Sequence, residues 1–282
     1  MVLKKKIGSI TNFVAEYLRK SNNQRLLGLI ATLYSIPITK QIIRIQYDEN
    51  IWTHRHNDGV IFDRKINYEH SLPKFESMTI DTYEYLYKPK YGDVVFDIGA
   101  GIGTETYHFS KAVGQKGKVI SIEAHPHTYL CLNKFCKHNK LTNVILFNLA
   151  ISNNETEVLI SNNEKHISST IINTKKGRKV KSITLDSLMK QLNILNIEFL
   201  KMNIEGAEKK AIEGMSESIK KTKFVCISCH DHRADLEGLE EMRTKELVKN
   251  FLKKNNFKII NRDSDNRAWI RDQINGINRK YL

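Results

Sequence analysis

The segment that most constrains the fold is VVFDIGAGIG, residues 94–103. An apolar run of the strand type ends at Asp97, and Gly99, Gly101 and Gly103 follow at alternate positions. Because glycine tolerates the left-handed backbone and close approaches of a tight turn, the pattern predicts a strand, a glycine-rich turn and a helix. Two large enzyme classes bind a cofactor at such a turn: nicotinamide- or flavin-dependent oxidoreductases, and methyltransferases that use S-adenosylmethionine.

Downstream of this turn, strand-like and helix-like segments alternate, which predicts a mostly parallel, doubly wound α/β sheet. The expected helices cover residues 104–113, 126–138, 184–195, 206–214 and 236–254, and the expected strands are KVISIEA, NVILFNLAI, ETEVLIS, EFLKMNI and FVCISCH. FKIINR and RAWIRD then predict a closing antiparallel hairpin across residues 263–266. Such a hairpin is expected for a seven-stranded methyltransferase sheet and not for a six-stranded dinucleotide fold.

The spacing of the glycines favours S-adenosylmethionine over a dinucleotide. The dinucleotide fingerprint is G-x-G-x-x-G, and a match that starts at Gly99 requires Gly or Ala where this chain has Thr104. Asp97 also disfavours a ligand with two phosphates, whereas an acid there can order the loop and attract the ammonium and sulfonium of S-adenosylmethionine. The alternative to a cofactor site is that this glycine-rich turn is purely structural.

Two later strand ends carry polar side chains suited to a nucleoside. Glu123 ends the second strand, twenty residues beyond Gly103, where a carboxylate can accept both ribose hydroxyls. Asn148 ends the third strand, where a side-chain amide can read the edge of an adenine. Together with the glycine turn, these positions predict a cofactor site at the carboxyl ends of the strands.

The motifs FDIGAGIG, ISIEAHP, NLAIS, SITLDSL and FLKMNIEGAEKKAIEG resemble the FkbM family of methyltransferases in order and spacing, over residues 91–260. The resemblance implies a Rossmann-like class I methyltransferase fold, S-adenosylmethionine as methyl donor, and O-methylation of a saccharide, glycan or glycolipid hydroxyl. It implies that residues 184–186 support the edge of the sheet and the pocket. The cofactor site that it implies consists of Asp97, Gly99, Ala100, Gly101, Gly103, Glu123, Ala124 and Asn148.

The chain departs from the family pattern at Asn203, because the family usually has aspartate at this position of its KxDxEGAE element. Asparagine can orient a hydroxyl by hydrogen bonding but cannot act as a base or a metal-binding carboxylate. We therefore expect Asn203, Glu205 and His230 as the catalytic residues, with either of the last two as the base. The alternative for Glu205 is an acid that only stabilises the N-terminus of the following helix. The C-x-x-C-H motif at residues 226–230 is interpreted as buried thiols followed by a histidine at the edge of the site, and no metal or haem is expected.

Residues 1–76 match no known family and are expected to form an N-terminal helical, accessory segment before a methyltransferase domain at residues 77–282. Two or three helices are expected up to residue 46, with Pro37 starting the third, and residues 47–75 are expected to be irregular apart from a turn at residues 57–59 between short strands. The apolar stretch at residues 26–38 is too short to span a membrane and is interpreted as a buried or docking helix, the alternative being a helix on a membrane surface.

Two clusters of basic residues suggest which molecules the chain binds. Residues 1–45 contain eight basic residues and one acidic residue, which is half of the net charge of +14, and residues 175–181 form a second basic cluster. Such clusters attract phosphate, anionic lipid or acidic glycan. The expected acceptor is a saccharide or glycolipid, with a peripheral contact between residues 1–45 and an anionic membrane surface as a hypothesis and a solvated basic face as its alternative.

Cytoplasmic location is expected because the first residues lack the apolar core of an export signal, and the four cysteines are therefore expected to be free thiols. An RNA methyltransferase and a non-catalytic S-adenosylmethionine-binding scaffold are the rival functions. No RNA-binding module with interleaved aromatic residues is visible, so no nucleic-acid partner is expected.

Overall fold

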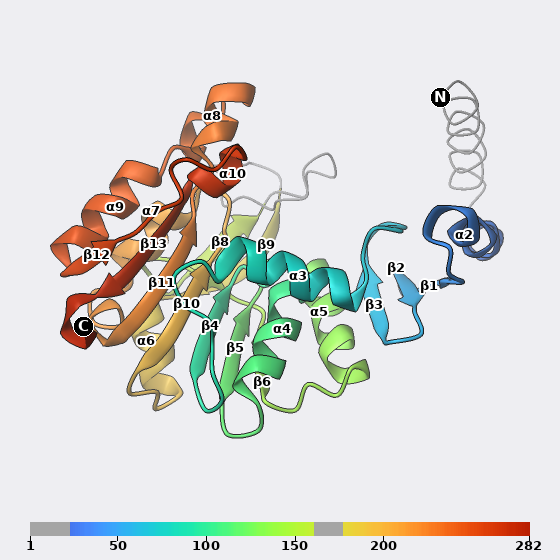
Figure 1. Ribbon diagram of the computed structural model, residues 1–282, viewed down its shortest axis with the longest axis horizontal. Helices are drawn as coiled ribbons and strands as arrows, with labels where there is room; N and C mark the ends of the chain where they lie inside the picture. Colours follow the sequence, from blue (N-terminus) through green and yellow to red (C-terminus); the bar gives the residue numbers. More distant parts are fainter. Residues whose placement is uncertain (1–22, 161–176) are drawn as a thin grey trace. The chain divides into compact units, whose positions relative to one another are not determined.

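The computed structural model describes residues 23–160 and 177–282, and the chain divides into two compact units, Met1–Lys74 and Phe75–Leu282 (Figure 1). The predicted helix before residue 22 and the first residues of the basic cluster at 175–181 lie outside the described residues.

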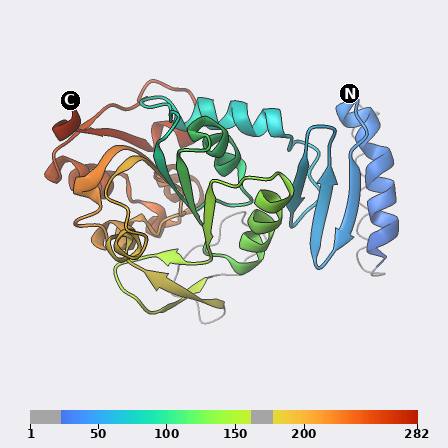
Figure 2. The ribbon, with the colours of Figure 1, turned by 90° about the horizontal axis from the view of Figure 1, so that it is seen from below.

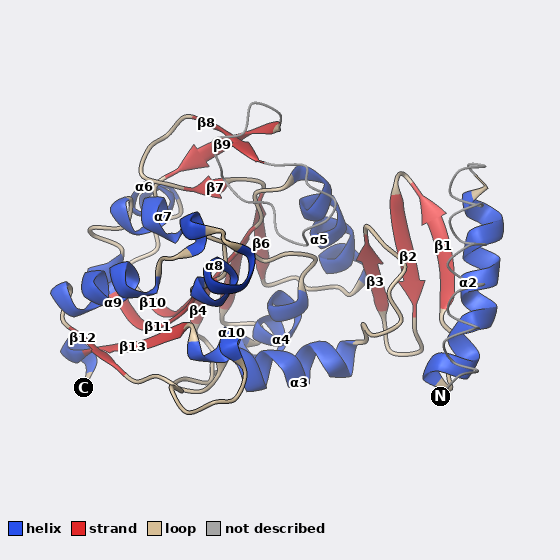
Figure 3. Cartoon of the chain, turned by 90° about the horizontal axis from the view of Figure 1, so that it is seen from above, coloured by secondary structure: helices blue, strands red, loops and turns tan. Residues whose placement is uncertain are grey.

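The first unit contains a helix and a three-stranded antiparallel sheet with the order β1-β2-β3. Its elements are α2 (Gln24–Thr39), β1 (Arg44–Asp48), β2 (Ile51–Arg55) and β3 (Val60–Asp63). α2 lies along β1 at the edge of this sheet (Figure 2, Figure 3). The side chain of Asn23 caps the helix by accepting from the backbone N–H of Leu26 at 3.3 Å. The predicted turn at residues 57–59 is confirmed, because it joins β2 to β3.

Two expectations for this unit are wrong. Pro37 does not start a third helix but lies within the last turn of α2, which ends at Lys40 with a left-handed φ of 59°. Proline lacks one backbone N–H, but the last turn is still closed by the N–H of Lys40, which donates to the carbonyl of Ile36 at 2.9 Å. Residues 44–63 form an ordered sheet and not a largely irregular segment, since Ile45, Ile51 and Ile61 are buried among the exposed polar residues of short strands.

The second unit is built on a seven-stranded sheet, as predicted. Its spatial order is β12-β13-β11-β10-β4-β5-β6, and all neighbours are parallel except β13, which is antiparallel to both of its neighbours. The strands are β4 (Val94–Ile98), β5 (Lys118–Ile122), β6 (Val144–Phe147), β10 (Ile197–Met202), β11 (Thr222–Ser228), β12 (Phe257–Ile259) and β13 (Gln273–Asn278).

Helices cover both faces of this sheet, with α3 and α4 on one side and α6, α7 and α9 on the other (Figure 3). The helices are α3 (Leu72–Tyr83), α4 (Thr104–Val113), α5 (Pro126–His138), α6 (Leu185–Gln191), α7 (Glu208–Glu213), α8 (Asp231–Glu237), α9 (Lys245–Lys254) and α10 (Ala268–Arg271), with 3₁₀ turns η1 (Ile219–Lys221), η2 (Glu240–Met242) and η3 (Arg279–Tyr281). Because strand side chains alternate, Val95 packs with Phe109 on the α4 face, whereas Phe96 belongs to the core that includes Leu188 and Leu252.

A second small sheet of the order β7-β9-β8 accompanies the main one. Its strands are β7 (Ala150–Ile151), β8 (Glu157–Ile160) and β9 (Arg178–Ile183). The segment NVILFNLAI, expected as one strand, therefore supplies two: β6 stays in the main sheet, and β7 pairs with β9.

The closing hairpin exists, but its second strand lies further along the chain than expected. β12 pairs with β13, whereas RAWIRD contains the helix α10. The reason is the carboxylate of Asp265, which accepts hydrogen bonds from both Arg262 and Arg267 and folds the intervening segment into a compact loop.

The long helix expected at residues 236–254 is also wrong. Gly238, with φ +69°, ends α8, and a separate helix, α9, begins at Lys245. Asp231 caps α9, since its carboxylate accepts the backbone N–H groups of Thr244 and Lys245 at 3.0 Å each.

Candidate active site

The main sheet reverses its direction of growth between β4 and β10. β5 and β6 extend it on one side of β4, and β10 and β11 extend it on the other. Ligands of such sheets bind beyond the carboxyl ends of the strands at this reversal. The predicted site residues follow five adjacent strands at this edge: Asn148 after β6, Glu123 and Ala124 after β5, residues 97–103 at β4, Asn203 and Glu205 after β10, and His230 after β11.

The glycines of the turn after β4 have different roles. A Cβ on Gly99 would lie 1.9 Å from the backbone oxygen of Asn203, so only glycine lets the ends of β4 and β10 approach. Gly101 has φ +56°, and a Cβ there would meet no atom within 4 Å. Gly103, with φ +104°, precedes α4 and packs against Phe135, and Ala100 is fully buried. Gly101 is therefore the glycine that borders free space.

Asp97 is buried, and both of its carboxylate oxygens are engaged inside the protein. Lys201 of β10 donates to one at 2.8 Å, and the hydroxyl of Thr106 donates to the other at 2.6 Å. Lys201 also donates to the carbonyl of Gly99 at 2.9 Å, so the pair holds the turn in place. Of the two roles expected for Asp97, the geometry supports ordering of the loop.

Lys201 was not predicted as part of the site. It is fully buried, with Glu105 3.5 Å away and the ring of Tyr83 5.3 Å away. Burial by itself lowers the pKa of a lysine, but the carboxylates of Asp97 and Glu105 raise the pKa of Lys201 well above its usual range. A signal existed in the sequence, because a lysine interrupts the otherwise apolar run FLKM at the carboxyl end of a strand.

Glu123 binds the backbone of both neighbouring loops. One carboxylate oxygen accepts the N–H of Gly101 at 2.9 Å, and the other accepts the N–H of His125 at 2.8 Å. Burial raises the pKa of Glu123 to about 7, against the opposing effect of these two hydrogen bonds. The side chain lies where the sequence predicts a ribose-binding carboxylate.

Asn148 supports the same loop from the next strand. Its amide nitrogen donates to the carbonyl of Glu123 at 2.9 Å and to that of Ala124 at 3.0 Å. Since the amide N–H groups are engaged by the backbone, the carbonyl oxygen of Asn148 is the atom suited to accept a bond from an adenine amino group.

The side-chain oxygen of Asn203 has no hydrogen-bond partner among the described residues. Its amide nitrogen donates to the hydroxyl of Tyr83 at 3.0 Å, and its backbone N–H donates to the carbonyl of Ile98 at 2.9 Å. Its side-chain oxygen is buried and has no hydrogen bond to any residue within 23–160 and 177–282. A buried acceptor of this kind is costly unless something donates to it, which indicates a ligand position beside the glycine turn. Tyr83, from α3, was not predicted.

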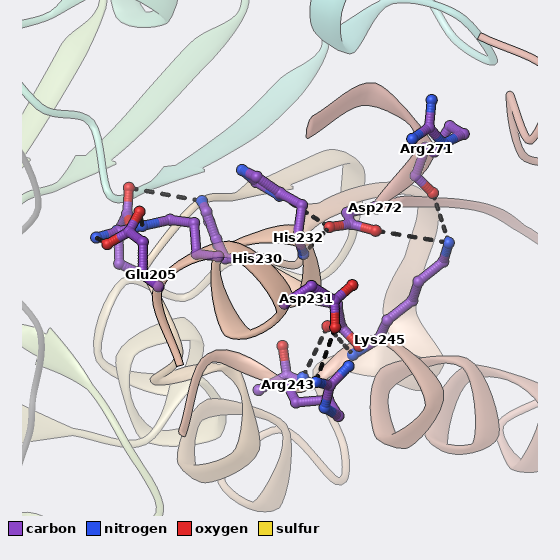
Figure 4. A network of polar contacts seen from close by, with 12 residues as sticks. Glu205, His230, Asp231, His232, Arg243, Lys245, Arg271 and Asp272 are labelled. Carbon is purple, nitrogen blue, oxygen red and sulfur yellow. Dashed lines mark hydrogen bonds and ion pairs between the residues drawn. The ribbon is translucent and has the colours of Figure 1, made fainter. Parts of the chain in front are cut away.

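The structure brings Glu205 and His230 together (Figure 4). One carboxylate oxygen of Glu205 lies 3.5 Å from Nε2 of His230, and the other accepts from Arg233 at 2.5 Å. Glu205 adopts a left-handed φ of 54°, an uncommon conformation for a residue with a side chain. Such strained positions cluster at functional sites.

Burial controls the protonation of this group. Desolvation lowers the pKa of His230, which keeps the imidazole neutral at pH 7 despite the nearby carboxylate of Glu205. Behind it, the fully buried Glu208 has its pKa raised to about 7, mainly by desolvation, and accepts the hydroxyl of Thr244 at 3.0 Å. A neutral imidazole beside a carboxylate can accept a proton.

The remaining polar residues at this edge are structural. His232 bonds to Asp272 through both its backbone N–H and its ring, at 2.7 and 2.8 Å, which ties α8 to the start of β13. Thr184 caps α6, and Asp186 accepts backbone N–H groups of the loop after α7. Cys226 and Cys229 are buried free thiols.

The residues at this edge fit S-adenosylmethionine. Gly101 leaves open space beside the turn, the Glu123 carboxylate lies at the adjoining strand end, and the side-chain oxygen of Asn203 receives no hydrogen bond from the residues that the structure describes. Glu123 and the backbone of residues 99–101 would hold the nucleoside, and Asn148 would meet its base.

Comparison with known proteins gives two matching family models. The methyltransferase FkbM domain matches residues 97–259, which is more than half of the chain. The protein-L-isoaspartate(D-aspartate) O-methyltransferase model matches residues 33–149. No curated protein matches the chain.

Several solved structures are similar to the chain. The methyltransferase FkbM from Methylobacillus flagellatus KT has 17% identity and a TM-score of 0.49, over 73% of this chain and 50% of that one. This chain thus matches half the length of that protein. Fibrillarin from Aeropyrum pernix, with natively bound S-adenosyl-L-methionine, has 10% identity and a TM-score of 0.45, over 83% and 97%. An S-adenosylmethionine-dependent methyltransferase from Aquifex aeolicus has 14% identity and a TM-score of 0.43, over 74% and 99%.

Proposed function

The chain belongs to the FkbM family of S-adenosylmethionine-dependent methyltransferases, and we propose that it methylates a hydroxyl oxygen of a saccharide, glycan or glycolipid. The observation that carries the proposal is the buried side-chain oxygen of Asn203, to which no residue in the described part of the chain donates a hydrogen bond. Asn203 follows β10, and its backbone lies directly against Gly99 of the glycine turn. A hydroxyl group is a donor that suits this acceptor.

Asn203 orients the acceptor hydroxyl. Its amide nitrogen is fixed by Tyr83, so its oxygen is held in one direction. When bound, S-adenosylmethionine would supply an electrophilic methyl carbon on its sulfonium. The acceptor oxygen would bond to that carbon as the carbon–sulfur bond breaks in line with it, and the sulfur would leave as the neutral thioether of S-adenosylhomocysteine. Holding that oxygen in line lowers the entropic part of the barrier, which supplies much of the rate in such a transfer.

His230 and Glu205 accept the proton that the hydroxyl loses. His230 is neutral at pH 7 because burial lowers its pKa, and its Nε2 faces a carboxylate oxygen of Glu205 at 3.5 Å. Arg233 holds the other oxygen of Glu205, which fixes the carboxylate for its task. The pair therefore supplies the base that Asn203 cannot be.

The chemistry of this group favours a neutral, hydroxyl-rich acceptor. The guanidinium of Arg233 is engaged by Glu205 and Glu237, so it is committed to carboxylates of the protein itself and not offered to a phosphate. The commitment of Arg233 to carboxylates of the protein supports a saccharide over RNA as the acceptor.

The experiment is transfer of labelled methyl from S-adenosylmethionine to three acceptor pools: glycans, glycolipids and RNA. We expect label in a saccharide-containing acceptor. Asn203→Ala should lower kcat by about 10²-fold, because the hydroxyl loses its orienting partner, while calorimetry gives a cofactor Kd within about threefold of wild type.

The control is Asn153→Ala, which removes an exposed amide bonded to Glu213 and should leave kcat unchanged. Label in RNA alone contradicts the acceptor class. Cofactor binding without transfer to any pool supports the non-catalytic scaffold instead.

A further inference from the structure

The helix α2 is apolar on two opposite faces. One face is buried against the sheet of its own unit and consists of Leu27, Gly28, Ala31 and Ser35. The opposite face carries Leu26, Leu29, Leu33 and Ile36 at helical spacing, and all four are exposed, Leu29 and Leu33 to 64% and 69%. Large apolar side chains gathered on one exposed face mark an interaction site.

The orientation of α2 is fixed by hydrogen bonds to the edge of the sheet. The hydroxyl of Thr32 accepts the N–H of Ile45 at 2.9 Å, and the hydroxyl of Ser35 accepts the N–H of Ile43 at 2.9 Å. A Cβ on Gly28 would lie 2.7 Å from the carbonyl oxygen of Ile45, so the helix backbone rests directly on the strand. The helix therefore cannot roll to bury its outer face without losing these contacts.

The charged residues of α2 and of the segment that follows it up to Ile45 are all basic. Arg25, Lys40 and Arg44 are exposed, and residues 23–45 contain no acidic residue. Residues 1–22 add five basic residues and one acidic residue in sequence. A second copy of the chain on this face is disfavoured, because a twofold contact would bring the same cations together.

We propose that the outer face of α2, defined by Leu26, Leu29, Leu33 and Ile36, binds the surface of an anionic lipid bilayer. Apolar side chains flanked by arginine and lysine are the pattern of helices that lie in the plane of the membrane interface. The helix has 16 residues and is about 24 Å long, so it lies on the bilayer as a peripheral contact. None of the helices within residues 23–160 and 177–282 is long and apolar enough to cross a membrane.

The test is sedimentation of the full chain with two kinds of vesicle: phosphatidylcholine alone, and phosphatidylcholine with an equal amount of phosphatidylglycerol. We expect the partition coefficient to be at least about tenfold higher on the anionic vesicles, since each basic residue at the surface strengthens binding by about fivefold. The double variant Leu29→Gln and Leu33→Gln should lose at least about tenfold on the same vesicles, because two apolar anchors are removed.

The matched control is Leu195→Gln with Leu236→Gln, two leucines of the other unit that are exposed to 77% and 80%. It should bind like wild type. Equal binding to both kinds of vesicle, or equal binding by the Leu29 and Leu33 variant, overturns the proposal. A dimer in lipid-free solution that dissociates in that variant, without vesicle binding by wild type, assigns the face to a second copy instead. None of these readouts involves methyl transfer, so the proposal stands or fails separately from the acceptor.

Discussion

Replacing Lys201 with methionine is expected to lower the free energy of unfolding by about 3–5 kcal/mol, the cost of leaving a buried carboxylate without its partner. Asp97 and Lys201 are both fully buried and 2.8 Å apart, and the ammonium also bonds to the carbonyl of Gly99. Folded proteins are stable by only about 5–15 kcal/mol, so this one change removes a large part of the total. Urea unfolding followed by circular dichroism measures it.

The pair itself is tested by a second variant. Asp97→Asn combined with Lys201→Met removes the fully buried carboxylate as well and leaves only that of Glu105 without its partner, so it should be more stable than Lys201→Met alone. The matched control is Lys220→Met, which removes an exposed ion pair with Glu217 and should change stability by less than about 1 kcal/mol. A loss of the same small size in Lys201→Met contradicts the role given to the buried pair.

Gly99→Ala is expected to destabilise the protein by about 3 kcal/mol or more, because its Cβ would overlap the backbone oxygen of Asn203 at 1.9 Å and force β4 and β10 apart. Gly101→Ala should cost only about 1–2 kcal/mol, the penalty of a left-handed backbone, since its Cβ enters open space. Thermal unfolding of the two variants gives the comparison. Equal losses of stability refute the close approach of the two strand ends.

Local sequence patterns were sufficient for the parts of the site that are close in sequence. The alternating strands and helices predicted the sheet, and the glycines with Glu123 marked the edge where the site residues gather. These features depend on residues within single strands, turns and helices that follow one another along the chain, so local sequence is enough to predict them.

The missing parts depend on contacts between distant segments. Lys201 and Asp97 are separated by 104 residues, and Asn203 and Tyr83 by 120, so neither partner could be paired from one sequence. The sheet of the first unit was predicted only as short strands around the turn at residues 57–59, because its strands are short and polar on one side. The closing strand was misplaced because Asp265 folds Arg262 and Arg267 into a loop. In both cases tertiary contacts decided the local structure.

S-adenosylmethionine is expected to bind in the open space beside Gly101, and calorimetric titration of folded variants measures this directly. Gly101→Ala places a Cβ in that space. The matched control is Gly92→Ala: Gly92 also has a positive φ, and a Cβ there would also meet no atom within 4 Å, but Gly92 precedes β4 and so lies at the opposite end of that strand. We predict one cofactor site in wild type, an unchanged Kd in Gly92→Ala, and a Kd raised at least about tenfold in Gly101→Ala, the result of lost contacts worth about 1.4 kcal/mol. Absence of binding in wild type, or equal affinity in the two glycine variants, would contradict it.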